Sequence, residues 1–191
     1  MAATDDAEEL LGPILRNVSR AFYLTLRVLP AEVRSPIALA YLLARTTDTI
    51  ADTQLVPAEK RMQKLQQFRA RIRDEGAPPV DFTHLAREQD SEAERALLQH
   101  SGEAIALLDK MEGADRGQIQ LVLETITRGQ ELDLARFGDG SELKALETAD
   151  DLDDYTYRVA GCVGEFWTRL TRTHCFADAE IDEQHFVQNS I

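Results

Sequence analysis

The stretch that decides the fold covers residues 38–52 and reads ALAYLLARTTDTIAD. Most of it is apolar or small, which is typical of a buried helix, yet it also carries Tyr41, Arg45, Asp48 and Asp52. Steps of four, three and four residues place these side chains on one stripe of a helix. Two carboxylates one turn apart repel each other, so an apolar helix that carries them needs a compensating cation.

Two interpretations of Asp48 and Asp52 follow from this spacing. Mg²⁺ prefers oxygen ligands and bridges readily to substrate phosphates, so the pair is a candidate magnesium site. The alternative is a charged helix end that faces water, and the spacing alone favours this alternative. Motifs elsewhere in the chain shift the balance toward the metal site.

Composition limits the classes of protein to which the chain can belong. Its 191 residues are 43% hydrophobic and 29% charged, which is typical of one soluble folded domain. Acidic residues outnumber basic ones by 34 to 21, giving a formal charge of −13. This charge argues against nucleic acid as a partner and against a polybasic face that docks on anionic lipid.

Cysteine usage and apolar runs indicate the compartment. Cys162 and Cys175 make no disulfide framework, which favours a reducing environment. The N-terminus is acidic and does not resemble a signal peptide, and the longest apolar stretch, residues 36–44, is too short to cross a bilayer. We therefore expect a cytoplasmic protein, with peripheral membrane contact left open.

Apolar residues recur at helical spacing along nearly the whole chain, and no stretch of useful length alternates as a strand would. The fold class predicted is therefore all-α. Breaks are expected near Leu29, across residues 76–79 and across residues 138–140. The expected helix starts are Pro36 (a start or a kink), Pro57, a capping box at residues 91–94, Asp115, and the acidic run at residues 150–154.

Two of these helices have a clear apolar face. The residues expected to turn inward are Met62, Leu65, Phe68 and Ile72 in one helix, and Val159, Cys162, Val163, Phe166 and Leu170 in the other. Gly161 and Gly164 in the second helix favour a close helix approach or a local break, since glycine is unfavourable in a helix interior.

Four separated blocks share an order that is typical of one protein family. They are SRAF at residues 19–22, the stripe at residues 41–52, GQELDL at residues 129–134, and YTYRVAGCVG at residues 155–164. Together they resemble the squalene/phytoene synthase family, the head-to-head isoprenyl diphosphate synthases. The DTxxD and YxxxVAGxVG forms are the specific parts, and the resemblance covers roughly residues 15–170.

The resemblance implies an isoprenoid-synthase-type helical bundle around a central cavity. It implies a Mg²⁺-dependent transferase that condenses two farnesyl diphosphates head to head through a cyclopropyl diphosphate (presqualene diphosphate). The DTIAD form of the acidic motif favours a squalene synthase, while phytoene or dehydrosqualene synthase is the alternative within the family. Squalene formation would also require NADPH, and the chain has no Rossmann-like fingerprint.

The resemblance also assigns roles to individual residues. Asp48 and Asp52 would bind the metal and act in catalysis together with Tyr155. The residues that would bind substrate diphosphate are Ser19, Tyr41, Arg45 and Asp133, and those that would line the cavity are Phe22, Val159 and Gly161.

Structural alternatives stay open for several of these positions. Arg45 could form a one-turn salt bridge to Asp48, and Ser19 could bond back to its own helix. Tyr41 and Phe22 could fill the core, and Arg158 could face either solvent or a phosphate.

The chain departs from the family at its C-terminal end. Relatives carry a second DxxxD motif on a later helix, whereas residues 178 and 182 have only the spacing of that motif. We therefore expect residues 1–191 to be a single incomplete domain that lacks the last helices of the bundle. Such a chain would leave apolar helix faces uncovered, favouring self-association, and its catalysis would be weak or absent. A non-catalytic remnant that binds prenyl lipids or a partner protein is the contrasting interpretation.

Overall fold

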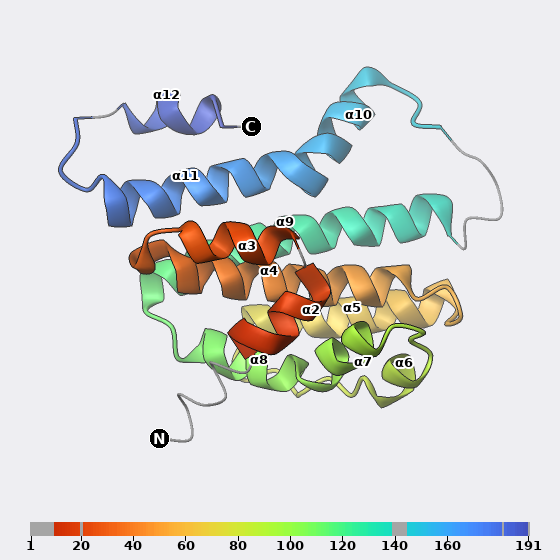
Figure 1. Cartoon of the computed structure of the whole chain (residues 1–191). Helices are drawn as coiled ribbons and strands as arrows, with labels where there is room; N and C mark the ends of the chain where they lie inside the picture. The colour runs from red at the N-terminus through yellow and green to blue at the C-terminus, as the bar shows by residue number, and fades with distance from the viewer. Residues whose placement is uncertain (1–9, 20, 139–144, 181, 191) are drawn as a thin grey trace.

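The computed structural model describes residues 10–19, 21–138, 145–180 and 182–190, and every element in these ranges is helical (Figure 1). The prediction of an all-α protein is confirmed. None of the described helices is both long enough and apolar enough to cross a membrane. The elements in chain order are η1 (Leu10–Ile14), α2 (Leu15–Ser19), α3 (Ala21–Val28), α4 (Ala31–Asp52), α5 (Ala58–Arg73), α6 (Thr83–Arg87), α7 (Glu92–Gln99), α8 (Ser101–Asp109), α9 (Gly113–Phe137), α10 (Ala149–Thr156), η2 (Tyr157–Gly161), α11 (Cys162–Cys175) and α12 (Glu183–Gln188).

Helix α4 is the central element, and it contacts α3, α5, α7, α8, α9 and α11. Leu39, Leu42, Leu43 and Ile50 on α4 are completely buried, so the prediction of a buried helix at residues 38–52 is confirmed. Figure 1 shows α4, α5 and α9 lying side by side, with α10 and α11 crossing above them. The C-terminal ends of α4 and α9 lie on the same side of the bundle, on the right in this view.

Pro36 does not start α4, so of the two predicted alternatives the helix start is wrong and the kink stays a prediction. The helix begins at Ala31, directly after an extended Pro30, and Pro36 lies inside it. Proline within the helix removes one backbone hydrogen bond, and here the missing bond falls in the second turn. Pro36 itself and the following Ile37 are buried, so their packing offsets that cost.

The start of α5 agrees with the sequence, because Pro57 directly precedes the helix. Leu65, Phe68 and Ile72 are buried as predicted. Arg61 lies four residues before Leu65 on the same stripe and is only 3% exposed, a feature that the apolar pattern did not include. One face of α5 therefore combines an apolar seam with a buried cation.

Two predicted caps have different partners from those expected. Ser91 accepts a hydrogen bond from the backbone of Glu94 at 3.4 Å, which confirms the cap, but the Glu94 carboxylate pairs with Arg45 at 2.5 Å. Asp115 does not cap α9, because that helix begins at Gly113 and Asp115 lies within its first turn. Asp115 instead contacts His174 at 2.8 Å and links α9 to α11.

The acidic run at residues 150–154 does open a helix. Thr148 and Asp151 form a reciprocal capping box at the start of α10. The single π-helical turn η2 then separates α10 from α11. Cys162, Phe166 and Leu170 are buried as predicted, whereas Val159 is 44% exposed and is not part of the buried face of α11. Val159 belongs to the π turn η2, which ends before α11 begins at Cys162.

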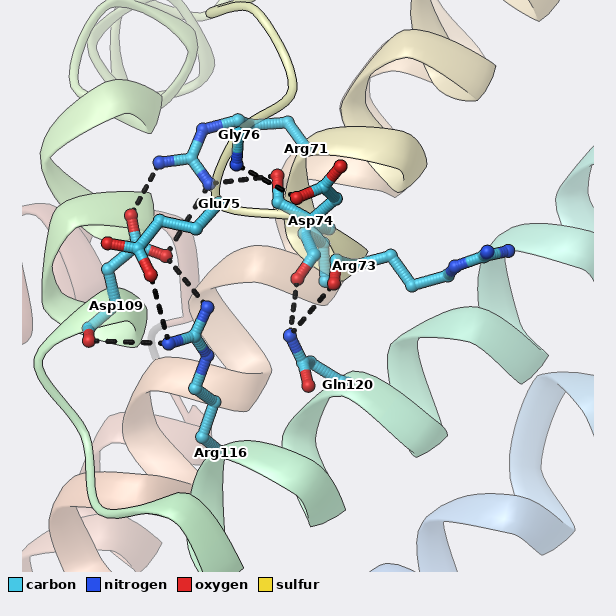
Figure 2. A network of polar contacts seen from close by, with 9 residues as sticks. Arg71, Arg73, Asp74, Glu75, Gly76, Asp109, Arg116 and Gln120 are labelled. Atoms are coloured by element: carbon cyan, nitrogen blue, oxygen red, sulfur yellow. Dashed lines mark hydrogen bonds and ion pairs between the residues drawn. The ribbon is translucent and has the colours of Figure 1, made fainter.

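A polar network closes the end of the bundle where α5 finishes (Figure 2). Arg71 of α5 pairs with Asp109 of α8 at 2.5 Å, and Arg116 of α9 lies 3.4 Å from the same carboxylate. Gln120 of α9 donates to the Ile72 carbonyl at 2.8 Å, satisfying an otherwise unpaired group in the last turn of α5. These contacts fix α9 against α5.

Large apolar side chains are exposed on several elements rather than gathered in one. Their exposed fractions run from 39% to 81%, and two of them, Leu24 and Val28, lie one turn apart on α3. The full set is Leu24, Val28, Leu55, Leu121, Leu152, Val159, Phe176 and Phe186. Self-association through uncovered helix faces stays a prediction.

Candidate functional site

A cavity of about 370 Å³ lies between the C-terminal ends of α4 and α9 and the segment α10–η2. Its apolar wall includes Ala51, Ile126, Leu134, Phe137 and Val159. Its polar lining consists of Asp48, Asp52, Gln54, Arg61, Gln130, Asp133 and Tyr155. The structure therefore brings five residues predicted from the sequence to one cavity: Asp48, Asp52, Asp133, Tyr155 and Val159.

Asp48 is the more enclosed member of the acidic pair. It is partly buried, while Asp52 is exposed at the last residue of α4. Burial raises the pKa of the Asp48 carboxyl, and Asp52 raises it further, while Arg45 and a hydrogen bond from Gln130 act in the opposite direction. The pair thus combines a desolvated carboxylate with a hydrated one, and both line the same hollow.

Helix α9 supplies the opposite polar wall. Gln130 donates a hydrogen bond from Nε2 to Oδ1 of Asp48. The other amide atom, Oε1, and the Oδ1 atom of Asp133 are both buried, and neither has a hydrogen-bond partner within the described ranges. Burial raises the pKa of the Asp133 carboxyl, with Arg136 lowering it. Two acceptor oxygens on α9 are thus left unpaired beside the cavity.

Close packing of η2 on α9 positions the third wall. A Cβ on Gly129 would lie 2.9 Å from Cβ of Arg158, so only glycine allows this approach. Arg158 itself pairs with Asp154, its Nε lying 2.9 Å from each carboxylate oxygen, and does not line the cavity. Tyr155, two residues before η2, lies in the lining of the same cavity as Asp48 and Asp52.

Ser19, Tyr41 and Phe22 lie outside the lining of this cavity. Phe22 stacks on Tyr41 with ring centroids 4.3 Å apart, and Trp167 of α11 meets Phe22 edge to face at 6.4 Å. The Ser19 hydroxyl donates to the Leu15 carbonyl at 2.5 Å, which is the back-bonded alternative. Their predicted roles beside the substrate stay predictions.

Arg45 and Gly161 also lie outside the lining. Arg45 pairs with Glu94 of α7 at 2.5 Å rather than with Asp48. Gly161 ends the π turn η2 and forms part of the link between α10 and α11. Their roles in binding diphosphate and in lining the cavity likewise stay predictions.

Gln130 and Arg61 also line the cavity, and neither was predicted from the sequence to have a role there. Gln130 lies three residues before Asp133, so helical spacing alone places the two on one face. Arg61 occupies the buried stripe of α5, and its guanidinium donates to the carbonyl of Ala51 near the end of α4. A cation on an otherwise apolar stripe was the signal that could have identified it.

The residues of the cavity fit a hydrated magnesium ion better than a fully protein-coordinated one. Within the described ranges, no group of three or more His, Cys, Asp and Glu side chains is arranged to hold a metal. Asp48 and Asp52, which both line the cavity, would supply the protein ligands. The unpaired oxygens of Gln130 and Asp133 are suited to accept hydrogen bonds from metal-bound water, which Mg²⁺ usually retains.

The fold and the acidic cavity together define an isoprenoid-synthase-type helical bundle. The chain superimposes on a solved structure of TcSQS in complex with a ligand, with a TM-score of 0.74 at 24% identity, covering 97% of this chain and 49% of that one. A model of the squalene/phytoene synthase family matches residues 15–187. The chain belongs to the squalene/phytoene synthase family.

Sequence relatives point the same way. The chain is 28% identical to a squalene synthase of Gibberella zeae over 179 residues, which is 93% of this chain and 36% of the relative. It is 29% identical to an inactive squalene synthase of Arabidopsis thaliana over 151 residues, which is 79% of this chain and 33% of the relative. The chain thus spans about a third of the length of these curated relatives.

Proposed function

We propose that the chain acts as a squalene synthase-like transferase, condensing two farnesyl diphosphates head to head through a cyclopropyl diphosphate intermediate. The observation that carries this proposal is the cavity in which Asp48 and Asp52 of α4, Asp133 of α9 and Tyr155 of α10 converge. Membership of the squalene/phytoene synthase family supports the same assignment.

In this proposal, the acidic wall handles the diphosphate. Asp48 and Asp52 would hold Mg²⁺, which neutralises negative charge on a leaving diphosphate when it is bound. The allylic C–O bond breaks, and its electron pair leaves with pyrophosphate. The double bond of the second prenyl chain attacks the allylic cation, and loss of a proton closes the cyclopropane ring. Tyr155 lines the same cavity and is suited to donate a hydrogen bond to the departing oxygen or to relay the proton.

The apolar wall would protect the cation. Ile126, Leu134, Phe137 and Val159 also line the cavity, and a prenyl chain could lie against them away from water. An aromatic face such as that of Phe137 also stabilises a nearby positive charge. Exclusion of water matters because water would trap the allylic cation as an alcohol.

The test is a turnover assay on the purified chain with farnesyl diphosphate and Mg²⁺. We expect pyrophosphate release that is lost when Mg²⁺ is chelated, and a cyclopropyl diphosphate as product in the absence of NADPH. Adding NADPH should convert the product to squalene, while geranylgeranyl diphosphate should be a poorer substrate. Phytoene or dehydrosqualene as the product would replace the squalene assignment by one of these alternatives.

A second candidate is a protein that binds prenyl diphosphates without turning them over. It is favoured by the single acidic pair, since the described residues include no larger metal-ligating group. In that case, isothermal titration calorimetry should show saturable binding of farnesyl diphosphate without any pyrophosphate release. Pyrophosphate release that depends on Asp48 would exclude this candidate.

A further inference from the structure

The hydrogen bond between Gln130 of α9 and Asp48 of α4 joins the two polar walls of the cavity. The carboxylate of Asp52 lies one helical turn from that of Asp48, and both residues line the cavity. An amide N–H that holds one carboxylate oxygen leaves the other oxygen with a defined direction. Without that donor, repulsion between the two carboxylates would favour rotamers that separate them.

The second amide atom of Gln130 adds to the argument. Its Oε1 atom is buried and has no hydrogen-bond partner among the described residues. A buried amide oxygen without a hydrogen-bond partner destabilises the fold unless a ligand or a water molecule donates a hydrogen bond to it. Because the same side chain lines the cavity, this oxygen is available to a water molecule bound to a cation there.

We propose that Gln130 is a positioning residue for the cation site, orienting Asp48 through Nε2 and accepting a hydrogen bond from metal-bound water through Oε1. The inference rests on the proposed function, because Asp48, the residue that Gln130 orients, is a metal ligand in that function. Groups that orient a metal ligand from outside the coordination sphere typically change metal affinity by about ten- to a hundredfold when they are removed.

The test measures Mn²⁺ binding by the disappearance of the free-ion EPR signal, so it needs no turnover. Gln130→Met keeps the length of the side chain and the helix propensity but removes both amide atoms. We expect it to weaken Mn²⁺ binding by about tenfold or more. Gln66→Met, at an exposed position of α5, is the matched control and should leave the affinity unchanged.

A double-mutant cycle separates positioning from a general effect on the fold. In an Asp48→Asn background, Gln130→Met should lower Mn²⁺ affinity far less than it does in the unsubstituted chain, because the residue it orients is gone. Gln130→His restores one ring N–H donor, so we expect it to recover part of the Mn²⁺ affinity that Gln130→Met loses. Equal losses in both backgrounds would overturn the inference.

The outcomes also distinguish this inference from the proposed function. If the unsubstituted chain binds Mn²⁺ and Gln130→Met binds it equally well, the inference fails while the proposed function stands. If the unsubstituted chain binds no Mn²⁺, both the inference and the Mg²⁺ dependence of the proposed function are wrong. If Gln130→Met loses affinity but farnesyl diphosphate is never turned over, the inference stands and the proposed function fails.

Discussion

The two halves of the polar stripe on α4 lie in different surroundings, although they share one face of one helix. The C-terminal half, Asp48 and Asp52, lines the cavity. In the N-terminal half, Tyr41 stacks on Phe22, and Arg45 pairs with a glutamate of α7. Periodicity thus identified the residues that share a face but not the elements that cover each part of it.

The covering elements explain the difference. Helices α3 and α7 pack on α4, as does α9, whose C-terminal part carries the other polar wall of the cavity. A carboxylate that meets an open cavity is available to a ligand, whereas a guanidinium that meets a carboxylate is already neutralised. Substitutions in the C-terminal half should therefore act on ligand binding, and those in the N-terminal half should act first on stability.

The largest expected effect is the loss of turnover when the C-terminal half is neutralised. Asp48→Asn combined with Asp52→Asn keeps the size of both side chains and removes both charges. We expect pyrophosphate release from farnesyl diphosphate to fall by on the order of a hundredfold or more, because the metal loses both protein ligands. Pyrophosphate release can be followed with a coupled phosphate assay.

Asp90→Asn is the control for this double substitution, since Asp90 is exposed and lies outside the cavity lining. It should leave the rate unchanged. Unchanged turnover in the double variant would show that the C-terminal half does not act on the substrate. The two halves of the stripe would then not differ in function.

Much of the fold and part of the site were predictable from helical spacing. Residues 41, 45, 48 and 52 lie in one continuous helix, where their spacing places them on one face, and the YxxxVAGxVG block does bring Tyr155 to the cavity of the acidic pair. Spacing could not show that Val159 would lie in a π turn with 44% of its surface exposed, because a π turn has a different period from the α-helix on which the prediction depends. It also could not show that Glu94 would bind Arg45 across two helices, since that contact depends on tertiary packing.

A second, smaller effect concerns the aromatic contact in the N-terminal half. Phe22→Ala removes the ring that stacks on Tyr41 and meets Trp167, and we expect it to lower the free energy of unfolding by about 2 kcal/mol. Urea unfolding measures this change. Mn²⁺ affinity should stay the same, and a loss of affinity without a loss of stability would instead place Phe22 in the ligand site.

A still smaller effect is expected in the pH dependence of stability, and it arises from Asp48 in the C-terminal half. Burial holds the pKa of Asp48 above its ordinary value, so the folded chain binds this proton more tightly than the unfolded chain does. The stability that Asp48 contributes is therefore present below its unfolded pKa, about 4, and is lost as the pH rises through the raised folded value.

Asp48→Asn removes this titration, so the variant should gain stability relative to the unsubstituted chain as the pH rises from about 4. Urea unfolding at a series of pH values measures the difference. Asp133, whose pKa is also raised by burial, is present in both proteins and cancels to first order. A difference that does not change with pH would show that Asp48 is not desolvated in the folded chain.

The smallest expected effect is the coupling between Arg45 and Glu94. Their side chains are 31% and 29% exposed, and an ion pair so accessible to water contributes about 0.5 kcal/mol. A double-mutant cycle with Arg45→Met and Glu94→Gln, read by urea unfolding, measures this coupling directly. If the pair is only structural, Glu94→Gln should leave the affinity for farnesyl diphosphate unchanged. If Arg45 also binds diphosphate, as the family resemblance implies, Glu94→Gln should increase that affinity, because it releases the guanidinium from its present partner.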